Sequence, residues 1–301
     1  MEKQTFLEMA WSYTRVLVLV LGTLSAAAIA AWSAVQGMVG WQHVTLFMVA
    51  ALWIRVSITL YNHRYFTHGA YQFTPLGAYT LKPLLLFGSG MAVQGSTEMW
   101  RGAHLKHHQY VDDWSQDPHS PNAPGGLLSK MWGFLWAHIF WMVYLKSVSK
   151  PVPSSQPRGW LEKIYGYDLT YILFGPILAG SIAWLLIGWL GVAWYFAAVC
   201  VTLHVTWGVN SVGHMWGSRP FPTKDCSRDS WLFVLLSPEY FHNAHHAFGS
   251  SARFVHKTWQ LLFDPEYLLL VACLRLGPLS LVRDIKVPSA EHVRRRRQTL
   301  V

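Results

Sequence analysis

The sequence predicts an all-α integral membrane protein. We expect four transmembrane helices in two hairpins, with a cytosolic helical cap that holds a histidine-ligated dimetal site. Of the 301 residues, 52% are hydrophobic and only 13% are charged, against roughly one-quarter charged residues in an ordinary soluble domain. Long uncharged stretches and three tight histidine clusters complete the prediction. The length suits a single domain over residues 1–301.

The first predicted hairpin covers about residues 16–60. No charged residue occurs in Val16–Val35, which is about the length that a membrane-spanning helix needs. A second uncharged stretch, Gln36–Ile54, follows a glycine-containing turn, and Arg55 lies near its end, where a long basic side chain can reach the membrane interface. The return helix therefore brings the chain back to the side on which it began.

The second predicted hairpin covers about residues 169–209. Residues 169–218 contain no Asp, Glu, Lys or Arg, which leaves room for two spans with a break near Gly188–Gly191. The second of these spans leads into Asn210 and His214. These two residues share one helix face if the helix continues beyond the membrane, because they are four positions apart.

Shorter apolar runs lie outside the hairpins, at Pro83–Thr97, Met131–Leu145 and about Leu268–Leu276. They are too short to span a bilayer and favour interfacial or buried helices. Pro151–Pro157 is rich in proline and serine and predicts a loop. We therefore expect a cap formed by residues 61–168 and 210–285.

The basic character of the chain does not indicate nucleic-acid binding. Apart from Arg294–Arg297, the residues behind the net charge of +9 are scattered beside apolar segments, as the positive-inside rule expects. We interpret residues 286–301 as a solvated basic tail near anionic lipid headgroups. The three cysteines, Cys200, Cys226 and Cys273, are far apart, which argues against a disulfide framework, an iron–sulfur site or a thiolate zinc site.

The histidine clusters indicate metal binding. Positions i, i+3 and i+4 of a helix share one face, so two of the clusters can each present three imidazoles together. His63 and His68 are five positions apart, about 140° around an α-helix, and need a helix end or a bend to converge. Imidazole suits Fe, Zn, Cu and Ni alike, so the ligand type does not fix the metal. The clustered histidines are His63, His68, His104, His107, His108, His242, His245 and His246, with His214 apart from them.

The other histidines have simpler interpretations. We expect His43, His138, His204, His256 and His292 to be core or interfacial residues, as isolated histidines on apolar helices usually are. His119 stands in an Asp-Pro-His sequence and is expected to support the site or the fold rather than bind metal.

Taken together, the motifs HRYFTH, HLKHH, HNAHH and Asn210-Ser-Val-Gly-His214 closely resemble the membrane-bound fatty acid desaturase family, particularly its Δ9 acyl-chain branch. Trp100 before the second motif, Asp117–Ser120 after it, and Gly217–Pro220 after His214 also match. The resemblance extends from about His63 to Phe248.

This resemblance implies a diiron site that activates O2 and removes two hydrogens from adjacent carbons of a fatty acyl chain held in a narrow tunnel. Two electrons come from an external donor of ferredoxin, rubredoxin or cytochrome b5 type, because no fused haem domain is present. The implied ligands are His63, His68, His104, His107, His108, His214, His242, His245 and His246, with Asn210 binding through a water molecule.

Carboxylates that orient the imidazole N–H groups are also expected. The candidates are Glu98, Asp112, Asp113, Asp117 and Glu239. For each of them, an ordinary surface or loop position is the alternative interpretation.

The acyl carrier stays open at this stage. Similar acyl-CoA desaturases have a charged pair where this chain has Gly102 and Ala103, which weakens the case for a CoA thioester. An acyl carrier protein or a membrane lipid is the alternative. An acidic carrier protein could dock on basic residues, namely Arg101, Lys106, Arg219, Lys224 and Arg228.

Two other classes of function are compatible with histidine clusters in a membrane protein. A related diiron enzyme, such as an acetylenase, a hydroxylase or a decarboxylase that forms a terminal alkene, would share these residues. A metal transporter is disfavoured, since its ligands should lie at mid-membrane depth, whereas the clusters lie beyond the predicted span ends. We expect a cytosolic active site, in a bacterial cytoplasmic membrane rather than the endoplasmic reticulum.

Overall fold

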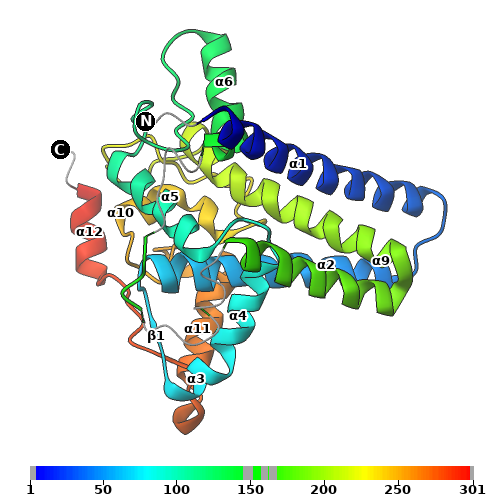
Figure 1. The fold of residues 1–301 in the computed structure, drawn as a ribbon. Helices are drawn as coiled ribbons and strands as arrows, with labels where there is room; N and C mark the ends of the chain where they lie inside the picture. The colour runs from blue at the N-terminus through cyan, green and yellow to red at the C-terminus, as the bar shows by residue number, and fades with distance from the viewer. Residues whose placement is uncertain (1–4, 145–151, 157–161, 163–167, 299–301) are drawn as a thin grey trace.

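The computed structural model describes residues 5–144, 152–156, 162 and 168–298, which are mostly helical (Figure 1). In chain order the elements are α1 (Phe6–Val35), α2 (Trp41–Ser57), η1 (Ile58–Thr67), β1 (Gln72–Phe73), α3 (Pro75–Tyr79), α4 (Leu81–Gly90), α5 (Thr97–Tyr110), α6 (Leu127–His138), η2 (Phe140–Tyr144), α9 (Asp168–Met215), η3 (Pro238–Tyr240), α10 (His242–Ala247), η4 (Thr258–Phe263), α11 (Pro265–Leu274), η5 (Gly277–Leu279), β2 (Val282–Arg283) and α12 (Ala290–Gln298).

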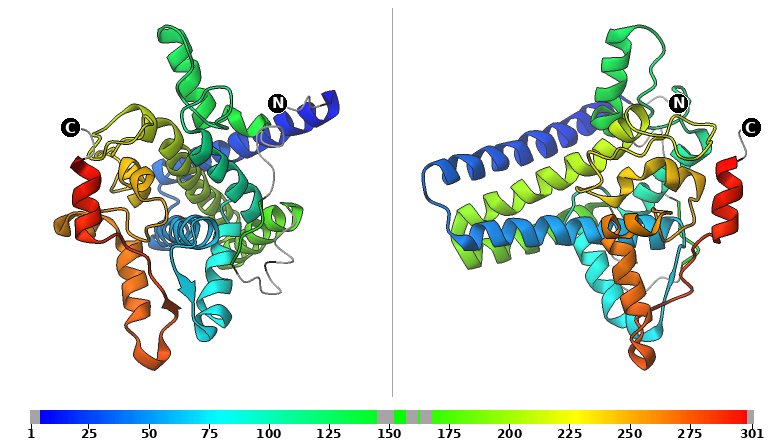
Figure 2. Two further views of the ribbon diagram at one scale, coloured as in Figure 1. Left: turned by 90° about the vertical axis from the view of Figure 1, so that its left-hand side faces the viewer. Right: turned by 180° about the vertical axis from the view of Figure 1, so that it is seen from behind.

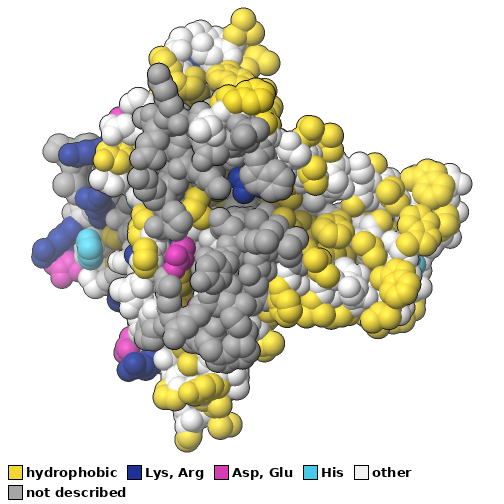
Figure 3. Space-filling model, in the orientation of Figure 1, with side chains coloured by type: hydrophobic (Ala, Val, Ile, Leu, Met, Phe, Trp, Pro, Cys, Tyr) yellow, Lys and Arg dark blue, Asp and Glu magenta, His cyan; other side chains and the backbone are white. Residues whose placement is uncertain are grey.

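A bundle of long apolar helices extends to one side of the molecule, where α1, α2 and α9 run next to one another (Figure 2). Among the described residues, three helical segments are long and apolar enough to cross a membrane: Ser12–Val35, Trp41–Thr67 and Phe174–Met215. Their large side chains cover the outer face of the bundle (Figure 3), while small residues such as Ala26, Ala30 and Ala183 are buried inside it. Such small residues allow close helix packing in a membrane, and the chain is a membrane protein.

The third apolar segment, α9, is broken at Gly188. Its backbone has φ 73° and ψ −162° there, a conformation that glycine adopts readily and other residues do not. A side chain at Gly191 would lie 2.4 Å from the Ala183 carbonyl oxygen, so the two arms of α9 approach closely beside the break. The break falls where the sequence predicts one, and the total of four spans stays a prediction.

The other elements form a cap at one end of the bundle. The strands β1 and β2 pair antiparallel, with Gln72 opposite Arg283, and join the first third of the chain to its last part. A buried ion pair of 2.7 Å between Arg64 and Asp264 makes a similar connection. These contacts hold η1, which carries the first histidine motif, against the C-terminal part of the cap.

The short apolar runs form short helices, as the sequence predicts. α4, α6 and α11 have 10, 12 and 10 residues, and α6 projects from the body of the molecule (Figure 1). Residues 152–156 contain no helix or strand, in agreement with the predicted loop. Leu145, Pro151 and Pro157 lie outside the described residues.

Most of the described residues in the predicted basic tail of residues 286–301 are exposed, and its nearness to lipid headgroups stays a prediction. Residues Ala290–Gln298 form α12, whose Val293 is only 6% exposed and packs in a hydrophobic cluster with Phe221 and Phe248. The helix lies at the end of the molecule opposite the free end of the bundle (Figures 1 and 2). Packing of Val293 holds it there, and its four arginines are exposed.

Candidate metal centre

The first histidine pair converges at the end of a π-helix, η1, whose C-cap is His68, so the helix end that the sequence requires is present and no bend is needed. In η1 the amide of His68 donates to the carbonyl oxygen of His63 at 3.1 Å, the i→i+5 hydrogen bond that defines this helix type. Residues five apart are then neighbours on one face, and the two imidazole centroids are 4.9 Å apart. The 140° separation expected for an α-helix does not apply here.

The other histidines come from three helices. α5 carries His104, His107 and His108, and begins where the Ser96 hydroxyl accepts a hydrogen bond from the Met99 amide, a common N-terminal cap. The six-residue α10 carries the HNAHH motif, and His214 occupies the last turn of α9. Four elements that are distant in sequence therefore supply the nine imidazoles.

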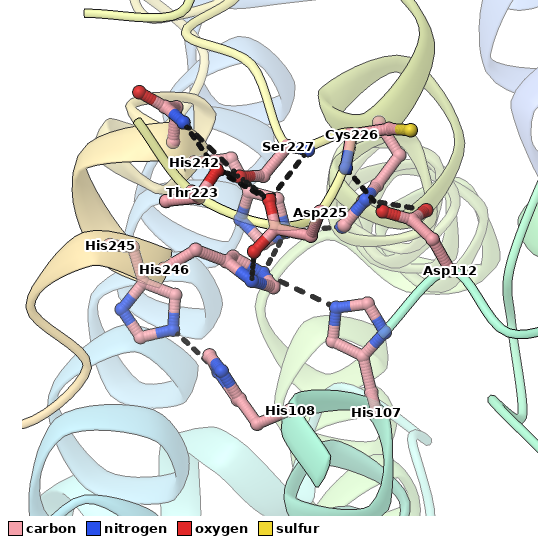
Figure 4. A network of polar contacts seen from close by, with 12 residues as sticks. His107, His108, Asp112, Thr223, Asp225, Cys226, Ser227, His242, His245 and His246 are labelled. Carbon is pink, nitrogen blue, oxygen red and sulfur yellow. Dashed lines mark hydrogen bonds and ion pairs between the residues drawn. The ribbon is translucent and has the colours of Figure 1, made fainter. Parts of the chain in front are cut away.

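The imidazoles form two groups. In the first histidine group, the ring nitrogens of His63, His68, His104 and His245 lie within 4.8 Å of one another. His108 joins this group, because its Nε2 is 3.0 Å from that of His104 and 2.9 Å from that of His245. The second histidine group has the same spacing and contains His107, His214, His242 and His246; parts of both groups are visible in Figure 4.

Carboxylates hold four of these rings by their Nδ1 atoms. The partners are Glu239 for His63 at 2.7 Å, Asp117 for His107 at 2.8 Å and Asp112 for His214 at 3.1 Å. Sequence reasoning missed the fourth, Asp225, which lies 3.3 Å from the Nδ1 of His246 (Figure 4). Asp225 belongs to an irregular loop 21 residues earlier, where no periodicity could reveal it.

The four carboxylates orient their histidine rings in the way that metal binding requires. A carboxylate at Nδ1 makes that atom the N–H donor, so the lone pair of a neutral ring is on Nε2. The Nε2 atoms of His107 and His246, both with carboxylates at Nδ1, face each other at 3.3 Å. Two lone pairs in this arrangement repel unless a cation lies between them, and neutral imidazole nitrogen is a good ligand for divalent first-row metals.

Burial keeps most of these rings neutral and able to bind metal. It lowers the pKa of His104, His107 and His245 well below 6.5, and the neighbouring imidazoles lower it further. Burial opposes ionisation of Glu239, but His63 outweighs it and lowers the carboxyl pKa. Burial prevails at Asp117, whose pKa is raised to about 7.

The remaining predicted residues lie as follows. Asp113 is exposed and accepts hydrogen bonds from Ser115 and Gln116, which agrees with the alternative interpretation of an ordinary loop carboxylate. Glu98 occupies the first turn of α5, and its role stays a prediction. His119 is buried with its ring 4.4 Å from that of His107 and its Nδ1 3.8 Å from Asp117, which agrees with a supporting position.

An apolar cavity of about 720 Å³ extends from the metal centre into the bundle. This is within the usual range for small-molecule sites. Its wall includes His104, His119 and Asn210 at the metal centre, Trp100 of α5, Leu19 and Ala26 of α1, and Trp189, Ala193 and Phe196 of α9. The lining suits a long apolar molecule whose reacting atoms lie beside the histidines.

A few polar groups interrupt this apolar lining near the histidines. The Gln94 side chain donates to the Thr206 hydroxyl at 3.1 Å and accepts from the Trp100 indole at 3.3 Å. The Trp100 ring stacks on His104 with centroids 4.9 Å apart. All four side chains line the cavity, so its shape there is fixed by hydrogen bonds and stacking.

Comparisons with known proteins agree with this geometry. The chain is similar to an acyl-CoA C20 Delta5-desaturase of Anemone leveillei, with 31% identity over 95% of this chain and 86% of that protein. It is 34% identical to an sn-1 stearoyl-lipid 9-desaturase of Anabaena variabilis over 68% of this chain and 71% of that protein. A hex-5-enoyl-[acyl-carrier protein] acetylenase of Moorena producens is 27% identical over 91% of this chain and 84% of that protein.

The fatty acid desaturase family model matches residues 39–256. The match includes both histidine groups, their four carboxylate partners and most of the bundle. The apolar cavity that ends at the clustered imidazoles agrees with an oxidoreductase that acts on fatty acyl chains. The chain belongs to the fatty acid desaturase family.

Proposed function

We propose that this protein is an O2-dependent diiron desaturase that introduces a double bond into a fatty acyl chain. The observation that carries the proposal is the apolar cavity whose wall includes His104 of the first group and Asn210 beside the second. One CH2–CH2 unit, one O2, two electrons and two protons give one CH=CH unit and two water molecules. Iron bound at this centre would activate O2, which is the oxidant that breaks the unactivated C–H bonds.

We assign one iron to each of the two histidine groups. His63, His68, His104, His108 and His245 hold one iron. The second iron is held by the second histidine group, with Asn210 binding through a water molecule. Glu239 and the three aspartates fix the ring orientations, since each accepts from an Nδ1–H.

The protein's part in the reaction is to position the acyl chain and exclude water. Residues of α1 and α9 hold the chain in one extended path, and Gln94, Trp100 and Thr206 shape the path beside His104. Orientation of this kind contributes much of the rate enhancement when the bound geometry is close to the reactive one. We expect it to select a single pair of carbons.

The break in α9 supports a proposal for the membrane arrangement. With α9 broken at Gly188, we propose four spans in two hairpins and a cytosolic cap, in a bacterial cytoplasmic membrane. An external redox protein supplies the electrons. The curated relatives act on acyl-CoA, acyl-lipid and acyl-carrier-protein substrates, and an acyl carrier protein or a membrane lipid suits the uncharged Gly102 and Ala103.

An acetylenase is the second candidate, because one relative with 91% coverage of this chain has that activity. It would require an acyl chain that already contains a double bond. Saturated and monounsaturated substrates supplied separately distinguish the two activities.

The test is product analysis by mass spectrometry. The iron-loaded protein is expressed in a host that makes saturated acyl chains, and we expect new alkenes at one position. Hydroxy acids or hydrocarbons without new alkenes would contradict the proposal. So would a purified protein that contains only zinc and stays inactive after iron is restored.

A further inference from the structure

We propose that α12 is the docking surface for a small acidic electron-carrier protein. This inference rests on the proposed function, which requires electrons from a separate redox protein. It concerns residues 290–298, which lie outside the part of the chain that matches the family model.

The exposed face of α12 carries a positive charge that favours an acidic partner. Arg294, Arg295, Arg296 and Arg297 are all exposed, and Glu291 pairs with Arg295 one turn away. Arg294 and Arg296 have no ion-pair partner among the residues that the structure describes. Basic side chains gather at this end of the molecule in Figure 3. Exposed charges of one sign attract an oppositely charged protein and accelerate its association.

A short series of contacts connects α12 to the metal centre. The Arg297 guanidinium lies 5.1 Å from the centre of the Phe221 ring. The Phe221 amide donates to the Asn243 side chain at 2.8 Å, and Asn243 follows His242 directly in α10. The loop that contains Phe221 also supplies Asp225, the partner of His246. A carrier bound at α12 would therefore lie next to the second histidine group.

The position of the acyl cavity favours an electron carrier over an acyl carrier as the partner of α12. The acyl cavity is lined by α1, α5, α9, η2, the residues before α5 and His119 after it, and no residue of α12 contributes to its wall. A protein that delivers an acyl chain has to dock where the cavity can receive it. The position of α12 away from the bundle also argues against lipid as its partner (Figures 1 and 2).

The step at this surface is electron transfer alone. The reduced carrier is oxidised, one electron at a time, and the metal centre is reduced. Two such events supply the two electrons of the desaturation, and the protons come from water.

The test uses the iron-loaded full chain in neutral phosphatidylcholine nanodiscs, with an acidic ferredoxin, its reductase and NADPH. The variant R294E/R296E keeps both Val293 and the Arg297–Phe221 contact. R275E/R283E reverses two other exposed charges, on the α11–β2 side of the molecule, and is the matched control. We measure KM for ferredoxin, kcat, and the Kd between ferredoxin and the enzyme at several salt concentrations.

We expect R294E/R296E to raise KM and Kd for ferredoxin about tenfold at low salt, with little change in kcat. Its salt dependence should be weaker than that of the wild type, because screening has less attraction to remove. R275E/R283E should resemble the wild type. The KM for the acyl substrate should be the same in all three proteins.

Equal Kd and salt dependence in R294E/R296E and the wild type would overturn the proposal. A change in KM for the acyl substrate alone would overturn it in favour of an acyl carrier. Loss of binding to phosphatidylglycerol vesicles without a change in Kd for ferredoxin would overturn it in favour of lipid. Dithionite as a chemical reductant tests the proposed function separately: if it yields no alkene with wild-type enzyme, that function fails, while the Kd still decides the docking.

Discussion

The two histidine groups are built from the same residue type but are oriented by different means. In the second group, three of four rings have carboxylates at Nδ1: Asp117, Asp112 and Asp225. In the first group, only His63 has one among the residues that the structure describes. Aromatic rings surround the first group instead, with Trp100 stacked on His104 and Phe254 5.2 Å from the His245 ring.

The difference concerns how each ion is held. Asp112 and Asp225, together with an Asp117 that is partly ionised near pH 7, give the second group more negative charge around its cation than Glu239 gives the first. Hydrogen bonds to Nδ1 also raise the basicity of a ligand. Packing can fix the direction of a ring but adds no charge. We infer that the second group binds iron more tightly and the first group binds it more weakly.

Removal of one ligand from each group should have the largest effect. We expect His245→Ala and His246→Ala to abolish desaturation, and each to lose the iron of its own group, because an apolar side chain leaves the ion short of one ligand. Iron content by mass spectrometry and alkene formation check this. His43→Ala, near the α1–α2 turn, is the control and should remain active. Full iron content in either ligand variant would contradict the assignment.

Neutralising the carboxylates should have the next largest effect. We expect Asp112→Asn and Asp225→Asn to lower activity or iron affinity about 10- to 100-fold, as loss of such partners does at other metal sites. Iron should leave the second group first. Glu239→Gln should act on the first group instead, and Asp113→Asn is the matched control. Titration with a chelator measures the order of release; equal release from both groups in Asp225→Asn would remove the proposed distinction.

Much of the arrangement of the histidines and of the bundle could be predicted from the sequence. The spacing of HLKHH and HNAHH places three imidazoles on one helix face, and Gly188 marks the break in α9. The convergence of His63 and His68 could not be predicted from α-helical geometry, since the π-helix depends on how η1 packs in the cap. Asp225 and the packing of α12 through Val293 were missed because each depends on contacts between distant segments.

A smaller effect should follow from changing the aromatic support of the first group. We expect Trp100→Phe to lower activity up to about tenfold with iron content unchanged, because it removes one hydrogen bond to Gln94 and keeps most of the ring. The distribution of double-bond positions should broaden as the cavity wall becomes less fixed. Gas chromatography of the products measures the activity and the distribution of double-bond positions. Loss of iron in Trp100→Phe would show that the ring does more than pack and shape the cavity.

The smallest effect concerns α10, which, like α5, supplies histidines to both groups. Asp229 accepts a hydrogen bond from the Ala244 amide at 3.2 Å, and burial raises its carboxyl pKa to about 7. A raised pKa means that the folded protein binds a proton that the unfolded chain has released. The stability from this group is therefore present below pH 4 and is lost as the pH rises towards 7. Asp229→Asn keeps the acceptor oxygen and removes the charge.

We expect Asp229→Asn to raise the Tm at pH 8 by about 2–4 °C, which corresponds to about 1 kcal/mol, and to have little effect near pH 4. Because α10 supplies His245 to the first group and His242 and His246 to the second, iron release from the two groups should change in parallel. Thermal unfolding at several pH values, with chelator titration beside it, measures both quantities. A shift confined to one group would mean that α10 does not respond as one unit, and that the difference between the two groups is also present within a helix that supplies both.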